Sequence, residues 1–387
     1  MTSQPEIVST PDRFKQVLAE LANAPRFSLD IESDSFYHYE ERVCIVTLST
    51  EDRNVIIDTL ALGEASRELQ QLVGRRDRPC LMHSASNDVL ALKRSFKLEF
   101  GLIQDTAMAG SLLGFAQTGL ATLVETFIGL RLPKDLQRYD WGQRPLQPVH
   151  QEYLINDTRH LFKVHDLIEE QLRKADIVDE YRIECEALAL SLPRERSFDP
   201  ERFRRIKGHE QLDASRRGAL KSLYAWRDRT ARGLNRAPFR VVSDHALMGL
   251  AAEPPKDEQE LASRSGIGNW LSSYVAEMLA ALKKGLSEPS PPRAPRVHHE
   301  PDPDNKPLDM RQRDILGKLK AWREQEAKAR GLGLQAIMPT PAFHDLVHTP
   351  PRNTEELGKL ARVGPSRAKR YGEPLLALLA PLNKRRA

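Results

Sequence analysis

The chain has 387 residues, 40% of them hydrophobic, and a formal net charge of +4. Because a typical domain holds about 100–200 residues, we expect two to four domains, each with its own core. No apolar run approaches the roughly 20 residues of a membrane span, and the first residues have no basic stretch followed by an apolar one. We therefore expect neither membrane association nor secretion, and we place the protein in the cytoplasm.

The positive charge is concentrated in one segment. Residues 203–240 contain eleven Lys and Arg against three Asp and Glu, so the rest of the chain is slightly acidic. A basic segment behind a more acidic N-terminal part indicates polyanion binding in the C-terminal half and carboxylate chemistry in the N-terminal half. Solvated helix faces are the alternative explanation for such a basic run.

Strands give way to helices within the first 175 residues. Apolar and polar residues alternate through three predicted strands, and a polar turn joins the second to the third, so we expect an antiparallel meander. Helices separated by short strands follow, up to about residue 173. The strands are predicted at 26–32, 43–49, 54–58, 79–83 and 102–104, and the helices at 64–74 and from 87 onwards. This order predicts a mixed sheet flanked by helices, which is compatible with a ribonuclease-H-like α/β domain.

Beyond residue 175 the sequence patterns are nearly all helical, and the same residues recur at a fixed spacing. Residues 225–227 and 321–323 both read Ala-Trp-Arg, and Gly268 and Gly364 also align at a period of about 96. Such a register argues for an internal duplication. Each Trp lies inside an apolar-periodic helix, so we expect it to anchor a core rather than to stack on a base. The Pro-rich residues 287–307 are predicted to form a linker between the copies.

Two acidic residues share one face of the first predicted strand. Asp30 and Glu32 alternate with Leu29 and Ile31. A period of two places both carboxylates on the face opposite the apolar side chains. The alternative is an ordinary amphipathic strand with its acids in water.

Three further residues extend this set. Asp88 follows a short apolar strand and stands near the start of a helix, where a carboxylate also serves as a helix cap. Tyr153 and Asp157 open a later helix at a spacing of i, i+4, which places the hydroxyl and the carboxylate on one helix face. Each feature has an ordinary structural explanation when taken alone.

Taken together, the acids predict a metal site. If Asp30, Glu32, Asp88 and Asp157 converge at one edge of the sheet, their charges repel, and divalent cations remove that cost. Oxygen-only ligands favour Mg²⁺ or Mn²⁺ over zinc. Hydrolysis of a phosphodiester needs an activated water and stabilised charge on the attacking and the leaving oxygen, which two cations about 3.5–4 Å apart provide. We therefore expect two divalent metal ions.

These residues resemble the motifs of the DEDD exonuclease superfamily, in its Tyr-containing branch, and within it those of ribonuclease D. The resemblance covers nearly the whole chain. The first motif lies around Asp30 and Glu32, the second at residues 83–88 and the third at residues 153–157. Residues 119–146 resemble the stretch that ribonuclease D proteins carry between the last two motifs.

The resemblance implies a role for each residue of the site. Asp30 would bridge both metals, Glu32 and Asp157 would hold the metal on the side of the nucleophile, and Asp88 would support the other. Tyr153 would orient the attacking water. The family pattern also implies a free 3′ end as substrate and the release of one nucleotide per turnover.

The duplicated units resemble HRDC domains, which are small helical bundles shared with RecQ-type helicases. The resemblance implies a ribonuclease-H-like exonuclease domain followed by two all-α HRDC bundles. The expected ranges are 1–175 for the exonuclease domain, 176–212 for a helical connector, 213–286 for the first HRDC domain, 287–307 for the linker and 308–387 for the second. The second copy departs from the HRDC pattern at residues 336–343, so we expect it to be mainly structural.

The resemblance implies a monomeric 3′→5′ exoribonuclease that trims 3′ extensions of tRNA precursors or other structured RNA. Arg227, Arg229 and Arg232 of the first HRDC domain would bind the RNA. Arg144 could contact phosphates of the scissile strand, and a surface salt bridge is an equal alternative. Two other functions stay open at this point: a 3′→5′ DNA exonuclease like that fused to some RecQ helicases, and a non-catalytic RNA-binding scaffold.

Overall fold

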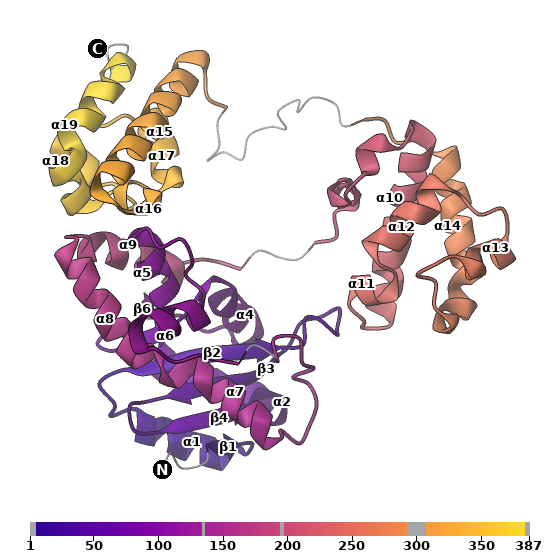
Figure 1. Cartoon of the computed structure of the whole chain (residues 1–387), viewed down its shortest axis with the longest axis horizontal. Helices are drawn as coiled ribbons and strands as arrows, with labels where there is room; N and C mark the ends of the chain where they lie inside the picture. Colours follow the sequence, from indigo (N-terminus) through magenta and orange to yellow (C-terminus); the bar gives the residue numbers. More distant parts are fainter. Residues whose placement is uncertain (1–4, 134–135, 194–196, 293–306, 384–387) are drawn as a thin grey trace. The chain divides into compact units, whose positions relative to one another are not determined.

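The computed structural model describes residues 5–133, 136–193, 197–292 and 307–383 of the chain (Figure 1). The chain divides into two compact units. The first unit is formed by the described parts of Met1–Glu32, Val43–Pro193 and Pro301–Ala387. The second is formed by the described parts of Ser33–Arg42 and Arg194–Glu300. Most of the predicted linker, residues 293–306, lies outside the described residues.

A six-stranded mixed sheet forms the centre of the first unit, in the order β1-β4-β3-β2-β5-β6. β3 pairs antiparallel with β4, whereas β1 pairs parallel with β4, and β5 pairs parallel with both β2 and β6. The strands are β1 (Glu6–Val8), β2 (Phe27–Ser33), β3 (Val43–Ser49), β4 (Asn54–Asp58), β5 (Pro79–Met82) and β6 (Leu102–Asp105). The prediction of a mixed sheet is confirmed, and β1 is an edge strand that the sequence patterns did not predict.

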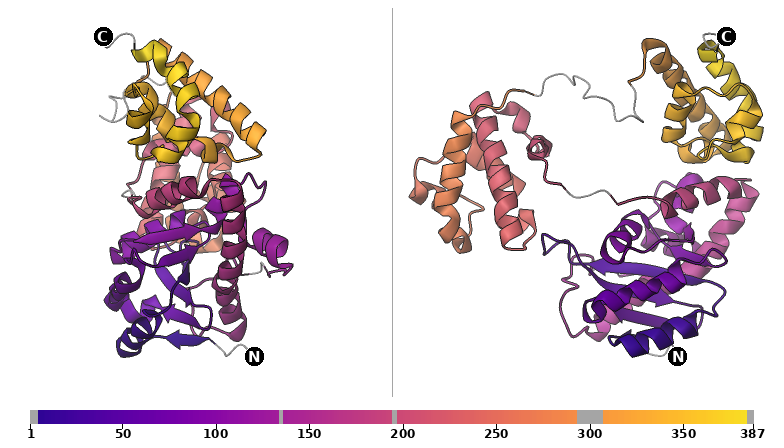
Figure 2. Two further views of the ribbon diagram at one scale, coloured as in Figure 1. Left: turned by 90° about the vertical axis from the view of Figure 1, so that its left-hand side faces the viewer. Right: turned by 180° about the vertical axis from the view of Figure 1, so that it is seen from behind.

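Helices cover both faces of this sheet (Figures 1 and 2). On one face, α1 and α4 contribute Phe14 and Leu92 to a core shared with Phe27 and Leu29 of β2. On the other face, α7 contributes Leu154 to a core with β3 and β4. The helical elements of this domain are α1 (Pro11–Leu21), α2 (Thr59–Leu62), η1 (Gly63–Leu69), α3 (Gln70–Val73), α4 (Ser86–Phe96), α5 (Thr106–Leu112), α6 (Leu120–Ile128), α7 (Pro148–Arg159), α8 (Leu161–Lys174) and α9 (Val178–Ala189). The helix expected at 64–74 is thus a 3-10 helix followed by one α-helical turn.

The second unit is a helical bundle built on two close-packed helices, α10 and α14. They approach so closely that a Cβ atom at Gly218 would lie 2.2 Å from the carbonyl oxygen of Gly285, so only glycine fits there. Trp226 is buried in the core of this bundle, as predicted. The elements are η2 (Pro200–Arg205), η3 (His209–Gln211), α10 (Ala214–Gly233), α11 (Pro238–Val241), α12 (Asp244–Ala252), α13 (Glu258–Ser263), η4 (Asn269–Tyr274) and α14 (Val275–Ser287).

A second helical bundle, in the first unit, repeats this arrangement 96 residues later. Arg227 donates a hydrogen bond to the carbonyl of Val242 (2.8 Å), and Arg323 donates the equivalent bond to Met338 (3.0 Å). Both guanidinium groups are buried. The elements are α15 (Met310–Arg330), α16 (Leu334–Ile337), α17 (Thr340–His348), α18 (Thr354–Gly358) and α19 (Gly364–Asn383). The predicted duplication is confirmed by this shared hydrogen bond and by the shared order of helices.

The second bundle packs against the exonuclease part of its unit. Arg367 is fully buried and pairs with Glu184 of α9 (3.1 Å). Arg370 pairs with Glu180, which is also buried (2.6 Å). The amide of Gly333 donates to the carbonyl of Leu112. These contacts favour the structural role expected for this copy.

None of the helices in the described residues combines the length and the apolar composition of a bilayer span.

Candidate active site

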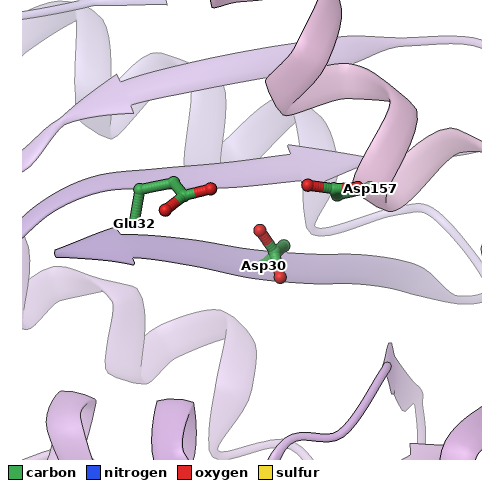
Figure 3. Close-up of side chains that lie close together, drawn as sticks. All are labelled: Asp30, Glu32 and Asp157. Carbon is green, nitrogen blue, oxygen red and sulfur yellow. The ribbon is translucent and has the colours of Figure 1, made fainter. Parts of the chain in front are cut away.

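Three carboxylates meet on one side of the sheet. Asp30 and Glu32 project from β2, and Asp157 projects from α7 toward them (Figure 3). Each offers an oxygen that lies within 4.8 Å of the other two. The strand pairing and the helix packing therefore bring together residues that stand about 125 positions apart in the sequence.

Hydrogen bonds to two strands of the sheet fix the helix that carries Asp157. Ser28, which shares the face of Asp30 on β2, donates to the backbone carbonyl of Thr158 (3.1 Å). The hydroxyl of Thr158 lies 2.7 Å from that of Ser49 on β3. All three partners are buried. The residue next to Asp157 is thus tied to both central strands, which holds the carboxylate over β2.

Asp88 stands in the first turn of α4, directly after β5. It is not one of the three residues whose oxygens lie within 4.8 Å of one another. Its charge nevertheless acts on the site, because it raises the pKa of both Asp30 and Glu32. Asp30, Glu32 and Asp157 therefore lie close together, whereas Asp88 acts on Asp30 and Glu32 through its charge.

Asp105, which is not among the predicted site residues, holds the loop that leads to Asp88. Its buried carboxylate accepts hydrogen bonds from the amides of Ser84 (3.0 Å) and Ala85 (2.9 Å). It also accepts from Ala107 (2.8 Å) and caps α5. An acid that satisfies several amides stabilises the ends of two elements at once. Its partners Ser84 and Ala85 lie about 20 residues away in the sequence, so no local pattern indicates these hydrogen bonds.

Burial and mutual repulsion dominate the electrostatics of the site. Burial raises the pKa of Asp30 well above its usual value, and the charges of Asp88, Asp157 and Glu32 raise it further. Burial, followed by Asp157 and Asp88, does the same to Glu32. Burial raises the pKa of Asp157 to about 7. Clustered buried carboxylates with oxygen-only donors fit hard divalent cations, which would offset the repulsion.

Tyr153 lies on the same helix one turn before Asp157. Burial raises the pKa of its hydroxyl above the usual value, and the charges of Asp157, Glu32 and Asp30 add to the effect. The phenol therefore stays protonated and can donate a hydrogen bond. Its ring packs on Trp141, with centroids 5.7 Å apart, so the aromatic contact limits the movement of the hydroxyl.

Arg144 forms an ion pair, which was one of the two alternatives that the sequence left open. It donates to Asp58 at 2.5 and 2.8 Å, and to the carbonyls of Cys44 (3.1 Å) and Trp141 (2.8 Å). The partners Asp58 and Cys44 lie on strands, so Arg144 anchors residues 141–144 to the sheet. Nothing local in the sequence pairs Asp58 with Arg144.

The three arginines expected to bind nucleic acid differ in exposure. Arg227 is buried, bonds to the carbonyl of Val242 and pairs with Asp244 (2.7 Å). Arg229 and Arg232 are exposed. Because a guanidinium committed to the core cannot reach a phosphate, we assign Arg227 to the packing of the bundle and retain only the other two as RNA-binding candidates.

Comparison with known families agrees with this geometry. Residues 5–173 match the family described as 3′-5′ exonuclease. Residues 216–282 and 312–379 each match the HRDC domain. The chain therefore carries a 3′-5′ exonuclease domain followed by two HRDC domains, which are modules of nucleic-acid enzymes.

The predicted resemblance to ribonuclease D is confirmed by similar proteins. Ribonuclease D of Gluconacetobacter diazotrophicus is 27% identical over 305 residues, covering 77% of each chain. That of Nitrobacter hamburgensis is also 27% identical, over 76% of each chain. The exosome complex component 10 homolog of Caenorhabditis elegans is 27% identical over 65% of this chain, but the chain spans only 29% of that relative's length.

Solved structures share the fold. The exoribonuclease RNase D of Escherichia coli superposes with a TM-score of 0.62 at 21% identity, covering 97% of this chain and 99% of that one. A protein from Bifidobacterium adolescentis gives a TM-score of 0.72 at 18% identity, with 97% of both chains covered. At these identities the superpositions support the architecture alone.

Proposed function

We propose that the protein is a metal-dependent 3′→5′ exoribonuclease that shortens RNA from a free 3′ end. The observation that carries the proposal is the cluster of Asp30, Glu32 and Asp157, with oxygens within 4.8 Å of one another, inside an exonuclease domain. The preference for RNA rests on the ribonuclease D relatives, of which that of Gluconacetobacter diazotrophicus matches over 77% of its own length and 77% of this chain.

The carboxylates are proposed to hold two divalent ions, Mg²⁺ or Mn²⁺. Asp30, which offers an oxygen within 4.8 Å of those of Glu32 and Asp157, would supply a ligand to these ions. Glu32 and Asp157 would hold one ion, and Asp88 would support the other. When bound, such ions supply positive charge to the attacking and the leaving oxygen of the phosphodiester.

Tyr153 is proposed to orient the attacking water. Its hydroxyl stays protonated because burial and three nearby carboxylates raise its pKa, so it donates a hydrogen bond and leaves a lone pair of the water free for attack. The packing of its ring on Trp141 holds this donor in place. Tyr153 thus acts by orientation rather than as a base.

The substrate is proposed to be a tRNA precursor or another structured RNA with a single-stranded 3′ extension. The exposed Arg229 and Arg232 of the first HRDC domain supply positive charge for phosphates. The monomeric state and the cytoplasmic location expected from the sequence stay predictions.

A comparison of RNA and DNA tests the activity. Single strands of one sequence, 5′-labelled, are incubated with the full chain in Mg²⁺ and in EDTA. We expect a ladder that shortens from the 3′ end with RNA in Mg²⁺ and none in EDTA. Faster shortening of DNA would favour the DNA exonuclease, because contacts to the 2′-hydroxyl distinguish the two polymers. Binding without shortening would favour the scaffold.

A further inference from the structure

The second unit contains a cavity of about 730 Å³ that the proposed chemistry does not use. Four segments line it: the loop 33–42, residues 197–202, helix α10, and the start of helix α11. The volume lies in the range of about 300–1,000 Å³ that is typical of small-molecule sites. Four aromatic side chains contribute to its walls, Tyr39, Phe198, Tyr224 and Phe239.

The loop 33–42 is fixed to the HRDC bundle by backbone and side-chain bonds. The amide of Ala237 donates to the carbonyl of Tyr37 (3.0 Å). Arg240 donates to the carbonyl of Phe36 (2.6 Å), and the guanidinium of Arg240 stacks on the ring of Tyr37 at 3.8 Å. The wall that this loop contributes is therefore built into the unit.

The aromatic rings of the cavity contact one another or a ring beside the cavity. Phe198 and Tyr224 stack with centroids 5.7 Å apart and planes inclined by 24°. Phe239 contacts the ring of Phe36 edge-on, with centroids 6.1 Å apart. Phe239 is nevertheless 50% exposed. Rings that are fixed before binding lose little conformational entropy when a ligand arrives.

The polar groups of the cavity suit a base that carries a phosphate. The carboxylate of Asp228 accepts a hydrogen bond from the hydroxyl of Tyr39 (2.8 Å) and keeps acceptor capacity for the N–H groups of a ligand. Arg202 lines the cavity, is exposed, and forms no ion pair with any residue that the structure describes. Arg232 stands beside the cavity rather than in its lining, 5.3 Å from the ring of Tyr39 and 3.9 Å from Asp228.

We propose that this cavity holds one unpaired nucleobase of a bound RNA strand. The base would stack on the aromatic walls, donate an amino or imino N–H to Asp228, and leave its phosphate near Arg202. Aromatic stacking accepts any base, because every base has a π-face. The site would thus add base contacts to the phosphate contacts of the HRDC domain. The identity of the ligand rests on the proposed function, whereas the site itself rests on the cavity.

An abasic scan of the RNA separates base contacts from phosphate contacts. Single-stranded RNAs that each lack one base, but keep every phosphate, are bound to the full chain in EDTA, and affinity is measured by fluorescence anisotropy. We expect one position at which loss of the base weakens binding about tenfold, as stacking energies of about 1–3 kcal/mol per base imply. A scan with no sensitive position would overturn the proposal.

Variants of the cavity residues test whether the sensitive base binds in the cavity. Phe239→Ala and Phe198→Leu each remove one ring of the cavity, and we expect either to weaken binding of intact RNA and to flatten the scan. Trp270→Ala is the matched control, since Trp270 is 40% exposed in the same unit but does not line the cavity; we expect it to retain the sensitive position. A scan unchanged in both cavity variants would contradict the proposal.

An activity assay with the same variants distinguishes the base-binding proposal from the proposed exoribonuclease activity. We expect Trp270→Ala to shorten RNA in Mg²⁺ at the wild-type rate, and Phe239→Ala to shorten it with a raised KM, because the cavity binds the strand and performs no chemistry. An abasic scan with no sensitive position, together with normal shortening of RNA, would disprove the base-binding role of the cavity but not the exoribonuclease activity. If the chain neither bound nor shortened RNA, both the base-binding role and the exoribonuclease activity would be disproved.

Discussion

Arg144 donates two hydrogen bonds to the carboxylate of Asp58, of 2.5 and 2.8 Å, from a position 86 residues further along the chain. Burial raises the pKa of Asp58, but the bonds from Arg144 outweigh it, and the pKa is lowered. Because Arg144 also donates to the carbonyl of Trp141, and Trp141 packs on Tyr153, the ion pair supports the position of the tyrosine hydroxyl from outside the site.

This relationship predicts the effect of Arg144→Ala. The change leaves the carboxylate of Asp58 largely buried without its partner, which costs on the order of 2 kcal/mol of unfolding free energy. We expect kcat to fall about tenfold with little change in KM, and Arg144→Lys to recover part of the loss. Thermal unfolding and steady-state kinetics measure both effects. Arg131→Ala, which removes an exposed ion pair, is the control and should change neither the unfolding free energy nor kcat. A wild-type kcat in Arg144→Ala would disprove the positioning role.

Asp105 gives the second prediction. In Asp105→Asn the side chain has one acceptor oxygen instead of two for amides that include those of Ser84, Ala85 and Ala107. We expect a loss of about 1–3 kcal/mol in urea unfolding and weaker binding of Mg²⁺, because the loop before Asp88 loses its anchor. Isothermal titration with Mg²⁺ measures the second effect. Unchanged Mg²⁺ binding would limit Asp105 to a role in stability.

The pKa of Asp157 gives the third prediction. Its value of about 7 in the fold lies above the usual 3.8, so between about pH 4 and 7 the metal-free fold keeps a proton that the unfolded chain has released. The unfolding free energy must therefore fall as pH rises through this window, by about 1.4 kcal/mol per pH unit for each such proton. Asp30 and Glu32 act in the same direction.

Chemical denaturation across pH 4 to 8, with and without saturating Mg²⁺, measures this dependence. We expect the stabilisation by Mg²⁺ to increase with pH, and Asp157→Asn to reduce that increase. The difference between the two conditions removes the contribution of groups far from the site. If Mg²⁺ stabilised the fold equally at every pH, the three carboxylates would not be the groups that bind it.

The fourth prediction separates Arg227 from Arg229. Arg227→Ala removes a buried guanidinium bound to the carbonyl of Val242 and to Asp244, so we expect it to destabilise the first HRDC domain. Arg229→Ala should leave stability unchanged and lower the slope of log K against log salt by about 0.7 for one lost contact to single-stranded RNA. Anisotropy titrations from 50 to about 200 mM salt measure the slope. An unchanged slope would exclude a phosphate contact at Arg229.

The sequence predicted the parts of the fold that local periodicity records. Alternation placed Asp30 and Glu32 on one face of β2, and the spacing of Tyr153 and Asp157 placed both on one face of α7, as the structure has them. The strand β1 was missed because a strand of three residues is too short to display alternation. The helix α1 follows directly and was missed with it.

Long-range partners could not be predicted, because no local pattern records them. Arg227 stands in a basic run, and its burial depends on the carbonyl of Val242 that the fold brings to it. The loop 33–42 follows the first catalytic motif, yet its partners lie some 200 residues away in the first HRDC domain. In the same way, Asp58 and Arg144 form a pair only once the sheet has formed.

We propose that Asp30, Glu32, Asp88 and Asp157 form the site at which RNA is shortened. The most direct measurement is time-resolved cleavage of a 5′-labelled tRNA with a 3′ extension in Mg²⁺, by the wild-type chain, Asp157→Asn, and Asp12→Asn as an exposed control on α1. Our prediction is a 3′→5′ ladder with the wild type and the control, and none with Asp157→Asn although this variant is folded and binds the RNA. A ladder of equal rate from Asp157→Asn would contradict it.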